Sequence, residues 1–245
     1  MKELSRKQAH VWVLPVTAED EPNIERLMRV LSDGEIERSE RFSHARNRRE
    51  YLSAHILTRL MLSNFADCEP SDWRFVTGQH GRPELAGFPE TTNLRFNLSH
   101  ARGMVACAVA HQDDIGVDVE WMERSNRFTD IAEKKFSQPE FSHFSDAPEN
   151  EKRHIFFSFW TLKESYIKAI GKGLLEPLDG FAFNLDPLKI SFLNDNSNAA
   201  CWGLDLFQPV PEYLCATSLA RPADEEVSIT RRVMNMPDLL ALASK

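Results

Sequence analysis

The sequence predicts an α+β fold that is built from two similar halves. Residues 47–65 and 151–170 both have the apolar periodicity of a long helix. Each long helix follows a strand and short helical material and precedes a run of strands. No sequence repeat of fixed period relates the two parts, so the similarity lies in the order of elements alone. The halves are expected to meet near residues 110–114, which gives domains 1–111 and 112–245.

In the first half, a strand is expected at residues 10–16. Ser32-Asp33-Gly34-Glu35 has the spacing of a capping box and starts a short helix that reaches Glu40. The long helix at 47–65 carries its apolar residues on one face. The remaining strands are predicted at 73–77, 94–98 and 104–110, and the last two form a pair.

In the second half, a strand at 115–120 is followed by two short helices, near 128–136 and after the capping box Ser137-Gln138-Pro139-Glu140. The long helix at 151–170 is stopped by Gly171 and Gly173, as a glycine after the last turn usually does. The elements expected after it are strands at 181–184, 189–193, 200–206, 213–220 and 227–231, and a short helix at 237–245.

The composition indicates a globular protein with an acidic balance. The 245 residues are 42% hydrophobic and 27% charged, with a formal net charge of −8. Nucleic-acid binding usually needs a basic footprint, so it is not expected. No stretch approaches the roughly eighteen apolar residues of a membrane span. The start lacks the features of a signal peptide, so no membrane association is expected.

The four cysteines are far apart in the sequence and have no paired spacing. Cys107 and Cys215 lie in strand-like apolar runs, which favours reduced, buried thiols over disulfides or zinc ligands. A cytoplasmic protein is therefore expected.

The second long helix carries an unusual charged stripe. Trp160, Glu164 and Lys168 are four residues apart, so they line one face of the helix, and Lys163 lies beside them. A Glu/Lys pair at this spacing is more often a solvated surface pair that contributes a few tenths of a kcal/mol. On so apolar a helix, the same residues also suggest a site.

Asp118 and Glu120 are two residues apart in a predicted strand, so both carboxylates leave one face while Val117 and Val119 point into a core. Crowded carboxylates are unfavourable unless a cation lies between them, and such oxygen ligands suit Mg²⁺. A lone D-x-E is more often an acidic face of an exposed edge strand. Glu164 supplies a third carboxylate, and the flanking lysines suit the charge of a pyrophosphate.

An arginine-rich stretch stands out against the acidic balance of the chain. It is either a solvated helix face or a site for a phosphate-rich ligand or an acidic partner. Its members are Arg38, Arg41, Arg46, Arg48, Arg49 and Arg59.

These motifs resemble a known family. Gly116-Val117-Asp118-Val119-Glu120, followed some forty residues later by the Trp160–Lys168 segment, resembles the paired signature of 4′-phosphopantetheinyl transferases of the Sfp type. Gly81-Arg82-Pro83 and Phe96-Asn97-Leu98-Ser99-His100 extend the resemblance, which covers about residues 31–186. It implies a monomer with two halves related by a pseudo-twofold axis, each a small antiparallel sheet packed on a long helix. The active site would lie at their interface.

The resemblance also implies roles for individual residues. Asp118, Glu120 and Glu164 match the family's Mg²⁺ ligands, and Lys163 and Lys168 match lysines beside the pyrophosphate of coenzyme A. Glu164 and Lys168 would take part in catalysis, with Glu164 acting as a base directly or through a water. Ser99 and His100 match a pair that contacts the nucleotide of coenzyme A, including its 3′-phosphate. Arg82 matches a position near the adenine. Arg48 or Arg49, with Arg49 favoured, matches an arginine at the 3′-phosphate.

The activity implied is transfer of the 4′-phosphopantetheine arm of coenzyme A to a serine of an apo acyl or peptidyl carrier protein, with release of adenosine 3′,5′-bisphosphate. Two alternatives use the same residues. One is a metal-dependent phosphodiesterase or hydrolase that acts on a nucleotide pyrophosphate. The other is a non-catalytic module that binds coenzyme A, although the presence of all three acids and both lysines speaks against it.

Overall fold

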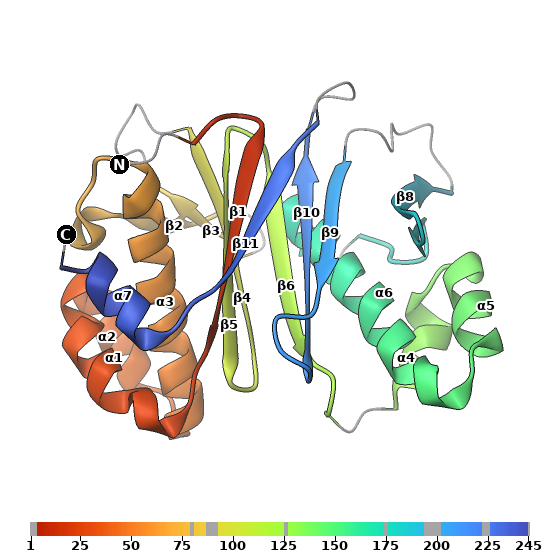
Figure 1. The fold of residues 1–245 in the computed structure, drawn as a ribbon, viewed down its shortest axis with the longest axis horizontal. Coiled ribbons are helices and arrows are strands. Elements are labelled where there is room, and N and C mark those ends of the chain that lie inside the picture. Colours follow the sequence, from red (N-terminus) through yellow and green to blue (C-terminus); the bar gives the residue numbers. More distant parts are fainter. Residues whose placement is uncertain are drawn as a thin grey trace.

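The computed structural model describes residues 4–78, 81–86, 93–124, 127–173, 176–193, 202–221 and 226–244. Four layers follow one another across the molecule: helix α3 (Ala45–Phe65), a four-stranded sheet, a three-stranded sheet and helix α6 (Glu149–Ala169) (Figure 1). Each half is thus a sheet backed by one long helix. The predicted α+β fold with two similar halves is confirmed.

The two main sheets differ in their strand directions. The four-stranded sheet has the order β11-β1-β5-β4 and the three-stranded sheet the order β6-β10-β9. All neighbouring strands are antiparallel except β11, which is parallel to β1. The strands are β1 (Gln8–Pro15), β4 (Leu94–Ala101), β5 (Met104–His111), β6 (Ile115–Trp121), β9 (Trp202–Phe207), β10 (Tyr213–Ala220) and β11 (Ser228–Val233). Two strand pairs form separate small sheets: β2 (Phe75–Thr77) with β3 (Pro83–Leu85), and β7 (Phe181–Leu185) with β8 (Leu188–Phe192).

Short helices cover the outer faces of the two long ones. Both predicted capping boxes are present, Ser32 with Glu35 and Ser137 with Glu140. Helix α1 was not predicted, because it is brief and buries only Ile24 and Leu27. The short helices are α1 (Glu21–Leu27), α2 (Asp33–Glu40), α4 (Phe128–Lys135), α5 (Gln138–Asp146) and α7 (Met236–Leu242).

The last segment of the chain returns to the first half. Strand β11 pairs with β1, and Met236 and Leu239 of α7 are buried in the same core as Trp12 (Figure 1). The predicted second half, 112–245, therefore includes a strand and a helix that pack on the other half. Strand pairing between distant residues leaves no local signal, which is why the sequence did not reveal this exchange.

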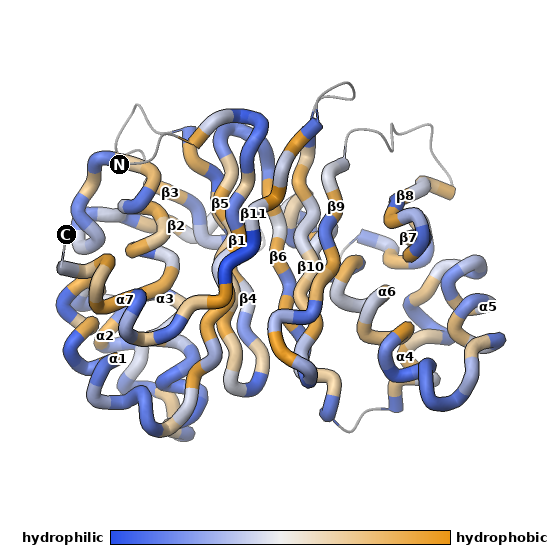
Figure 2. Tube along the Cα trace, in the orientation of Figure 1, coloured by the Kyte–Doolittle hydropathy of each residue, from blue (hydrophilic) through white to orange (hydrophobic). Residues whose placement is uncertain are grey.

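The two sheets pack face to face through small and β-branched side chains. Ala106, Ala108 and Ala110 of β5 meet Val117 and Val119 of β6 in this layer, and all five are buried. Apolar stretches occur both on the central strands and on the helices that flank them (Figure 2). As predicted, Val117 and Val119 point into a core, so that Asp118 and Glu120 face helix α6.

Side chains of β4, at the edge of one sheet, connect it to β6, at the edge of the other. The Asn97 side-chain oxygen accepts a hydrogen bond from the Val117 amide at 3.0 Å, and the Ser99 hydroxyl accepts one from the Val119 amide at 3.4 Å. These bonds satisfy backbone groups of β6 that have no strand ladder on this side. The junction therefore places Ser99 next to Asp118.

Candidate functional site

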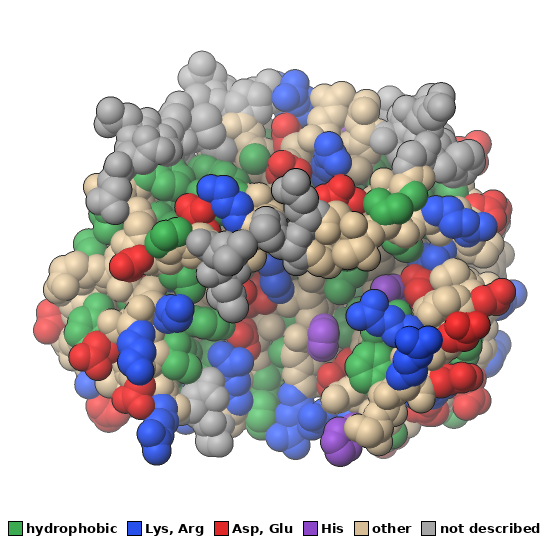
Figure 3. Space-filling view, turned by 180° about the vertical axis from the view of Figure 1, so that it is seen from behind, with side chains coloured by type: hydrophobic (Ala, Val, Ile, Leu, Met, Phe, Trp, Pro, Cys, Tyr) green, Lys and Arg blue, Asp and Glu red, His purple; other side chains and the backbone are tan. Residues whose placement is uncertain are grey.

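A cleft of about 590 Å³ opens where β4 of the first half meets β6 and α6 of the second. Lysine and arginine side chains lie over both halves and between them on this face (Figure 3). The residues that line the cleft are Arg46, Leu98, Ser99, His100, Ala101, Arg102, Asp118, Val119, Glu120, Trp121, Arg124 and Lys168.

Asp118 is the centre of a polar cluster that joins three elements. Its Oδ1 accepts hydrogen bonds from the Ser99 hydroxyl at 2.9 Å and from the Lys168 ammonium at 2.7 Å. Lys168 also donates to the Ser99 hydroxyl at 2.8 Å and to the Val117 carbonyl at 3.2 Å. The structure thus brings together three of the residues that the sequence proposed for the site.

The second carboxylate oxygen of Asp118 has no hydrogen-bond partner among the described residues. The Asp118 side chain lines the cleft although the residue is only 5% exposed, and its Oδ2 atom is buried. A buried charged oxygen without a donor is costly. Such an oxygen suits a cation or a donor that arrives with a ligand.

Glu120 and Glu164 flank Asp118. Glu120 accepts a hydrogen bond from the Trp160 indole at 2.8 Å and forms an ion pair with Arg124 at 2.9 Å. Burial and the nearby charge of Asp118 raise the pKa of Glu120 to about 7. Burial, and then Asp118, also raise the pKa of Glu164. Asp118 is therefore close enough to both glutamates to disfavour their ionisation.

These side chains fit a divalent cation, with one rearrangement. Among the described residues, no three His, Cys, Asp or Glu side chains are gathered closely enough to hold a metal ion. Lys168 and Arg124 instead neutralise Asp118 and Glu120. The donor set is nevertheless the hard oxygen set that Mg²⁺ prefers, and Asp118 Oδ2 is free of donors in the described structure. Metal binding would require the two cations to turn away.

The rim of the cleft contains Arg46, a member of the arginine-rich stretch, and Arg102, which the sequence did not single out. Arg102 lies 4.6 Å from the centre of the Trp121 ring, and Arg46 is 3.6 Å from the Glu50 carboxylate. His100 is exposed in the cleft, where lost hydration lowers its pKa more than Glu50 raises it. Arg102 lies close in sequence to His100, so its nearness to the motif was a signal that could have found it.

Arg49 and Lys163 are not among the residues that line the cleft. Arg49, like Arg48, forms an ion pair with Glu21, at 3.5 and 2.9 Å respectively. Helix α1, which the sequence did not reveal, supplies this partner. Lys163 is fully buried in an ion pair with Glu140 at 2.7 Å. In this arrangement neither Arg49 nor Lys163 lines the cleft, so the ligand contacts that the resemblance implies for them stay predictions.

Arg82 connects the two halves. Its guanidinium donates to the Ala169 carbonyl of α6 at 2.9 Å and to the Ile115 carbonyl of β6 at 3.2 Å. Loss of hydration lowers its pKa, but arginine remains charged. These two hydrogen bonds thus connect Arg82, which directly precedes β3, to both α6 and β6.

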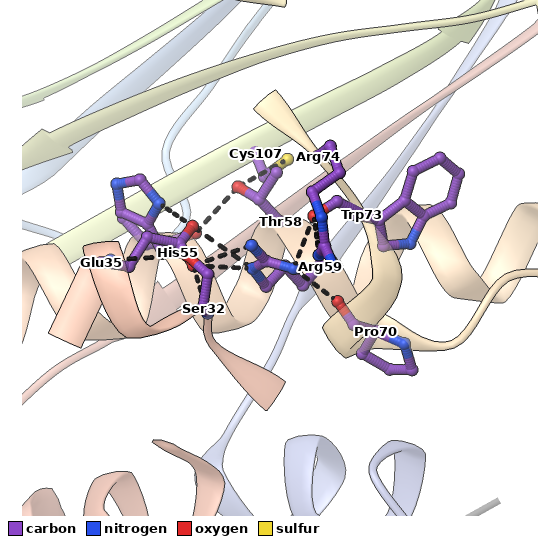
Figure 4. Close-up of polar contacts among 10 residues, drawn as sticks. Ser32, Glu35, His55, Thr58, Arg59, Pro70, Trp73, Arg74 and Cys107 are labelled. Carbon is purple, nitrogen blue, oxygen red and sulfur yellow. Dashed lines mark hydrogen bonds and ion pairs between the residues drawn. The ribbon is translucent and has the colours of Figure 1, made fainter. Parts of the chain in front are cut away.

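A second cavity of about 280 Å³ lies in the first half and shares Leu98 with the cleft. Its wall contains a buried network centred on Glu35 (Figure 4). Burial tends to raise the pKa of Glu35, but hydrogen bonds from His55, Ser32 and Arg59 lower it to about 2. The cations and rings that line the cavity are Arg38, Tyr51, His55, Arg59, Trp73, Arg74, Phe75 and Phe96.

Gly116 sets the distance between β6 and α6. A Cβ atom there would lie 2.0 Å from the Ser165 carbonyl oxygen and 2.4 Å from the Ala169 amide nitrogen. We expect Gly116→Ala to force α6 outward, to lower the free energy of unfolding by about 2–3 kcal/mol and to separate Lys168 from Asp118. Denaturant unfolding measures the loss. Gly34→Ala is the control, because a Cβ at Gly34 meets nothing within 4 Å; equal effects of the two changes would contradict the prediction.

The raised pKa of Glu120 predicts a pH dependence of stability. Between pH 4.5, the ordinary value, and about 7, the unfolded carboxyl is ionised while the folded one keeps its proton, so stability falls as the pH rises through this window. In EDTA, we expect the unfolding free energy of the wild type to fall by about 2–3 kcal/mol more than that of Glu120→Gln between pH 5 and 8. Glu123→Gln, at an exposed residue nearby, should show the same pH dependence of the unfolding free energy as the wild type. If Glu120→Gln also showed the wild-type pH dependence, Glu120 would not be its source.

Comparison with known proteins agrees with this geometry. Residues 18–112 match the family model "4'-phosphopantetheinyl transferase, N-terminal", and residues 114–218 match that of the 4'-phosphopantetheinyl transferase superfamily. The two models meet at the connection between β5 and β6.

Two curated relatives match along most of the chain. The 4'-phosphopantetheinyl transferase HetI of Nostoc sp. is 29% identical over 215 residues, which cover 87% of each chain. The 4'-phosphopantetheinyl transferase Sfp of Bacillus subtilis is 32% identical over 199 residues, which cover 81% of this chain and 86% of Sfp. The chain belongs to the 4′-phosphopantetheinyl transferase family, in its Sfp-like form.

Proposed function

We propose that the protein transfers the 4′-phosphopantetheine group of coenzyme A to a serine of an apo acyl or peptidyl carrier protein, with Mg²⁺ as cofactor. One observation carries this proposal: the cleft presents Asp118, with its unsatisfied buried oxygen, beside the Lys168 ammonium. A carboxylate that suits a metal and a cation that suits a phosphate are what a pyrophosphate substrate requires at one point.

The two cavities match the two ends of coenzyme A. The pyrophosphate would lie in the cleft at Asp118 and Lys168, with the exposed His100 beside it. The nucleotide end would extend past Leu98 into the second cavity, where Tyr51 and Phe75 offer aromatic surface. Arginines there suit the 3′-phosphate.

Each residue of the site would have a separate role in the reaction. Bound Mg²⁺, held by Asp118, Glu120 and Glu164, would supply charge neutralisation at the pyrophosphate. Glu164, with its raised pKa, is suited to accept the proton of the serine hydroxyl, directly or through a water. The serine oxygen bonds to the phosphorus of the phosphopantetheine group while the bond from that phosphorus to the oxygen of the adenosine 5′-phosphate breaks. Lys168 would offset the charge that develops on the departing adenosine 3′,5′-bisphosphate.

One assay tests the function. The purified protein is incubated with coenzyme A, Mg²⁺ and an apo carrier protein, and the carrier is weighed by mass spectrometry. A carrier heavier by one phosphopantetheine group on serine supports transfer. Cleavage of coenzyme A with an unmodified carrier supports the alternative, a metal-dependent hydrolase of nucleotide pyrophosphates.

Arg38 is our candidate for the 3′-phosphate, in place of the predicted Arg49. Arg38 lines the second cavity and lies 5.8 Å from the centre of the Tyr51 ring, whereas Arg49 is paired with Glu21. We expect Arg38→Ala to raise KM for coenzyme A about tenfold and to leave KM for 3′-dephospho-coenzyme A unchanged. Arg49→Ala is the matched control and should change neither by more than about twofold. If Arg49→Ala instead raised KM for coenzyme A and Arg38→Ala did not, Arg49 would be the residue that binds the 3′-phosphate.

We also propose that the protein is a monomer and is located in the cytoplasm. Both halves of the cleft come from one chain, so no second copy is needed to build it. Cys107 and Cys215 are buried as free thiols, as the sequence predicted. No helix among the described residues is long and apolar enough to cross a membrane.

A further inference from the structure

Lys163 stands directly before Glu164 in α6, yet its ammonium group points into the core of the second half. Its side chain is 0% exposed, and it lines up along the helix with the buried Phe159 and Ile167. Glu164 instead shares its face with Trp160 and Lys168. The two neighbours thus face different parts of the molecule.

Every donor of Lys163 already has an acceptor. The ammonium group contacts a Glu140 carboxylate oxygen at 2.7 Å, the Leu178 carbonyl at 2.5 Å and the Phe181 carbonyl at 2.9 Å. It has three hydrogens to donate, so none remains for a phosphate oxygen. To reach a ligand, Lys163 would have to leave Glu140 buried without a counter-charge, which is strongly unfavourable.

Glu140 is satisfied just as completely. One oxygen accepts hydrogen bonds from the Ser137 amide and hydroxyl at 2.9 and 2.6 Å, and the other accepts one from the Phe183 amide at 2.9 Å. Its side chain is also 0% exposed. The Glu140–Lys163 pair therefore ties the start of α5 and strand β7 to a single point on α6.

Such a point is needed because α6 is apolar around much of its circumference. When many similar apolar side chains surround a helix, packing alone defines its rotation about its axis only weakly. Hydrogen bonds to a buried charged group are directional, so they define a single rotation. A turn of α6 about its axis would carry Glu164 and Lys168 away from β6. The pair is thus suited to hold the catalytic face in place.

We propose that Lys163 and Glu140 are positioning residues of the transferase site, which fix the rotation of α6 and so direct Glu164 and Lys168 toward Asp118. Lys163 itself makes no contact with coenzyme A. The proposal rests on the proposed function for its catalytic consequence, but its effect on metal binding can be measured without any acceptor protein.

The decisive variant replaces both partners, Glu140→Leu with Lys163→Met. The single change Lys163→Met leaves a buried carboxylate unpaired and should lower the thermal midpoint more than the double change does. In the double variant we expect KM for coenzyme A to stay within about threefold of wild type, while kcat falls at least about tenfold and Mn²⁺ affinity, measured by electron paramagnetic resonance, weakens.

Each other result overturns the proposal. A rise of tenfold or more in KM for coenzyme A in the double variant would show that Lys163 binds the substrate. Unchanged kcat and Mn²⁺ affinity would reduce the pair to a purely structural role. If the double variant does not fold, Glu140→Gln gives the same decision, because it leaves Lys163 in place and lies outside the cleft lining. Failure of the wild type to modify any carrier refutes the proposed function, while the Mn²⁺ measurement still decides the positioning role.

Discussion

Asp118→Ala is expected to lower kcat/KM for phosphopantetheine transfer by at least about a thousandfold, which corresponds to about 4 kcal/mol of transition-state stabilisation. Asp118 is the one acid that contacts β4, α6 and the cleft together, through Ser99 and Lys168. Its removal takes away the unsatisfied oxygen that suits a metal and releases Lys168 from its place. No other described carboxylate combines these contacts.

The variant should remain folded, because Lys168 is partly exposed and can turn toward solvent when its partner is lost. Circular dichroism checks the fold, and a thermal shift with added Mg²⁺ separates loss of the metal from loss of chemistry. The wild type should be stabilised by the metal and Asp118→Ala should not. Asp118→Asn keeps the shape of the side chain and tests the charge alone. Wild-type activity in Asp118→Ala with an unchanged Mg²⁺ requirement would remove Asp118 from the site.

The core of the site could be predicted from sequence because its geometry is local to two elements. Alternation along a strand puts Asp118 and Glu120 on one face, and helical spacing aligns Trp160, Glu164 and Lys168. The structure sets these two faces against each other, with Trp160 on Glu120 and Lys168 on Asp118. Gly116, which lets the helix approach, lies in the same motif.

The contacts that the sequence did not reveal arise where the partner of a side chain lies on an element distant in sequence. Arg49 is held by Glu21, and Lys163 by Glu140. Neither pairing has a local signal in the sequence. The same reason explains the exchange of β11 and α7 into the first half, since a parallel pairing of β11 with β1 spans almost the whole chain.

Lys168 is expected to have two roles, and two different measurements should distinguish them. In the metal-free protein its ammonium neutralises Asp118, the position that a divalent cation would take, while in the reaction it would neutralise phosphate charge. Lys168→Met removes both interactions. We therefore expect kcat to fall by about a hundredfold or more, and Mn²⁺ affinity without coenzyme A to rise, because no internal cation competes for Asp118.

Opposite changes in the two measurements are the signature of this arrangement. Turnover with a carrier protein gives the first, and a Mn²⁺ titration followed by electron paramagnetic resonance gives the second. Lys172→Met is the matched control, since Lys172 lies just after the end of α6, is exposed and pairs with Glu176; it should alter neither quantity by more than about twofold. If Lys168→Met weakened Mn²⁺ binding, the ammonium would be supporting the metal site instead of occupying it. If kcat stayed at the wild-type level, the charge on the departing group would have to be met by another cation of the cleft, with Arg124 and Arg46 the first to test.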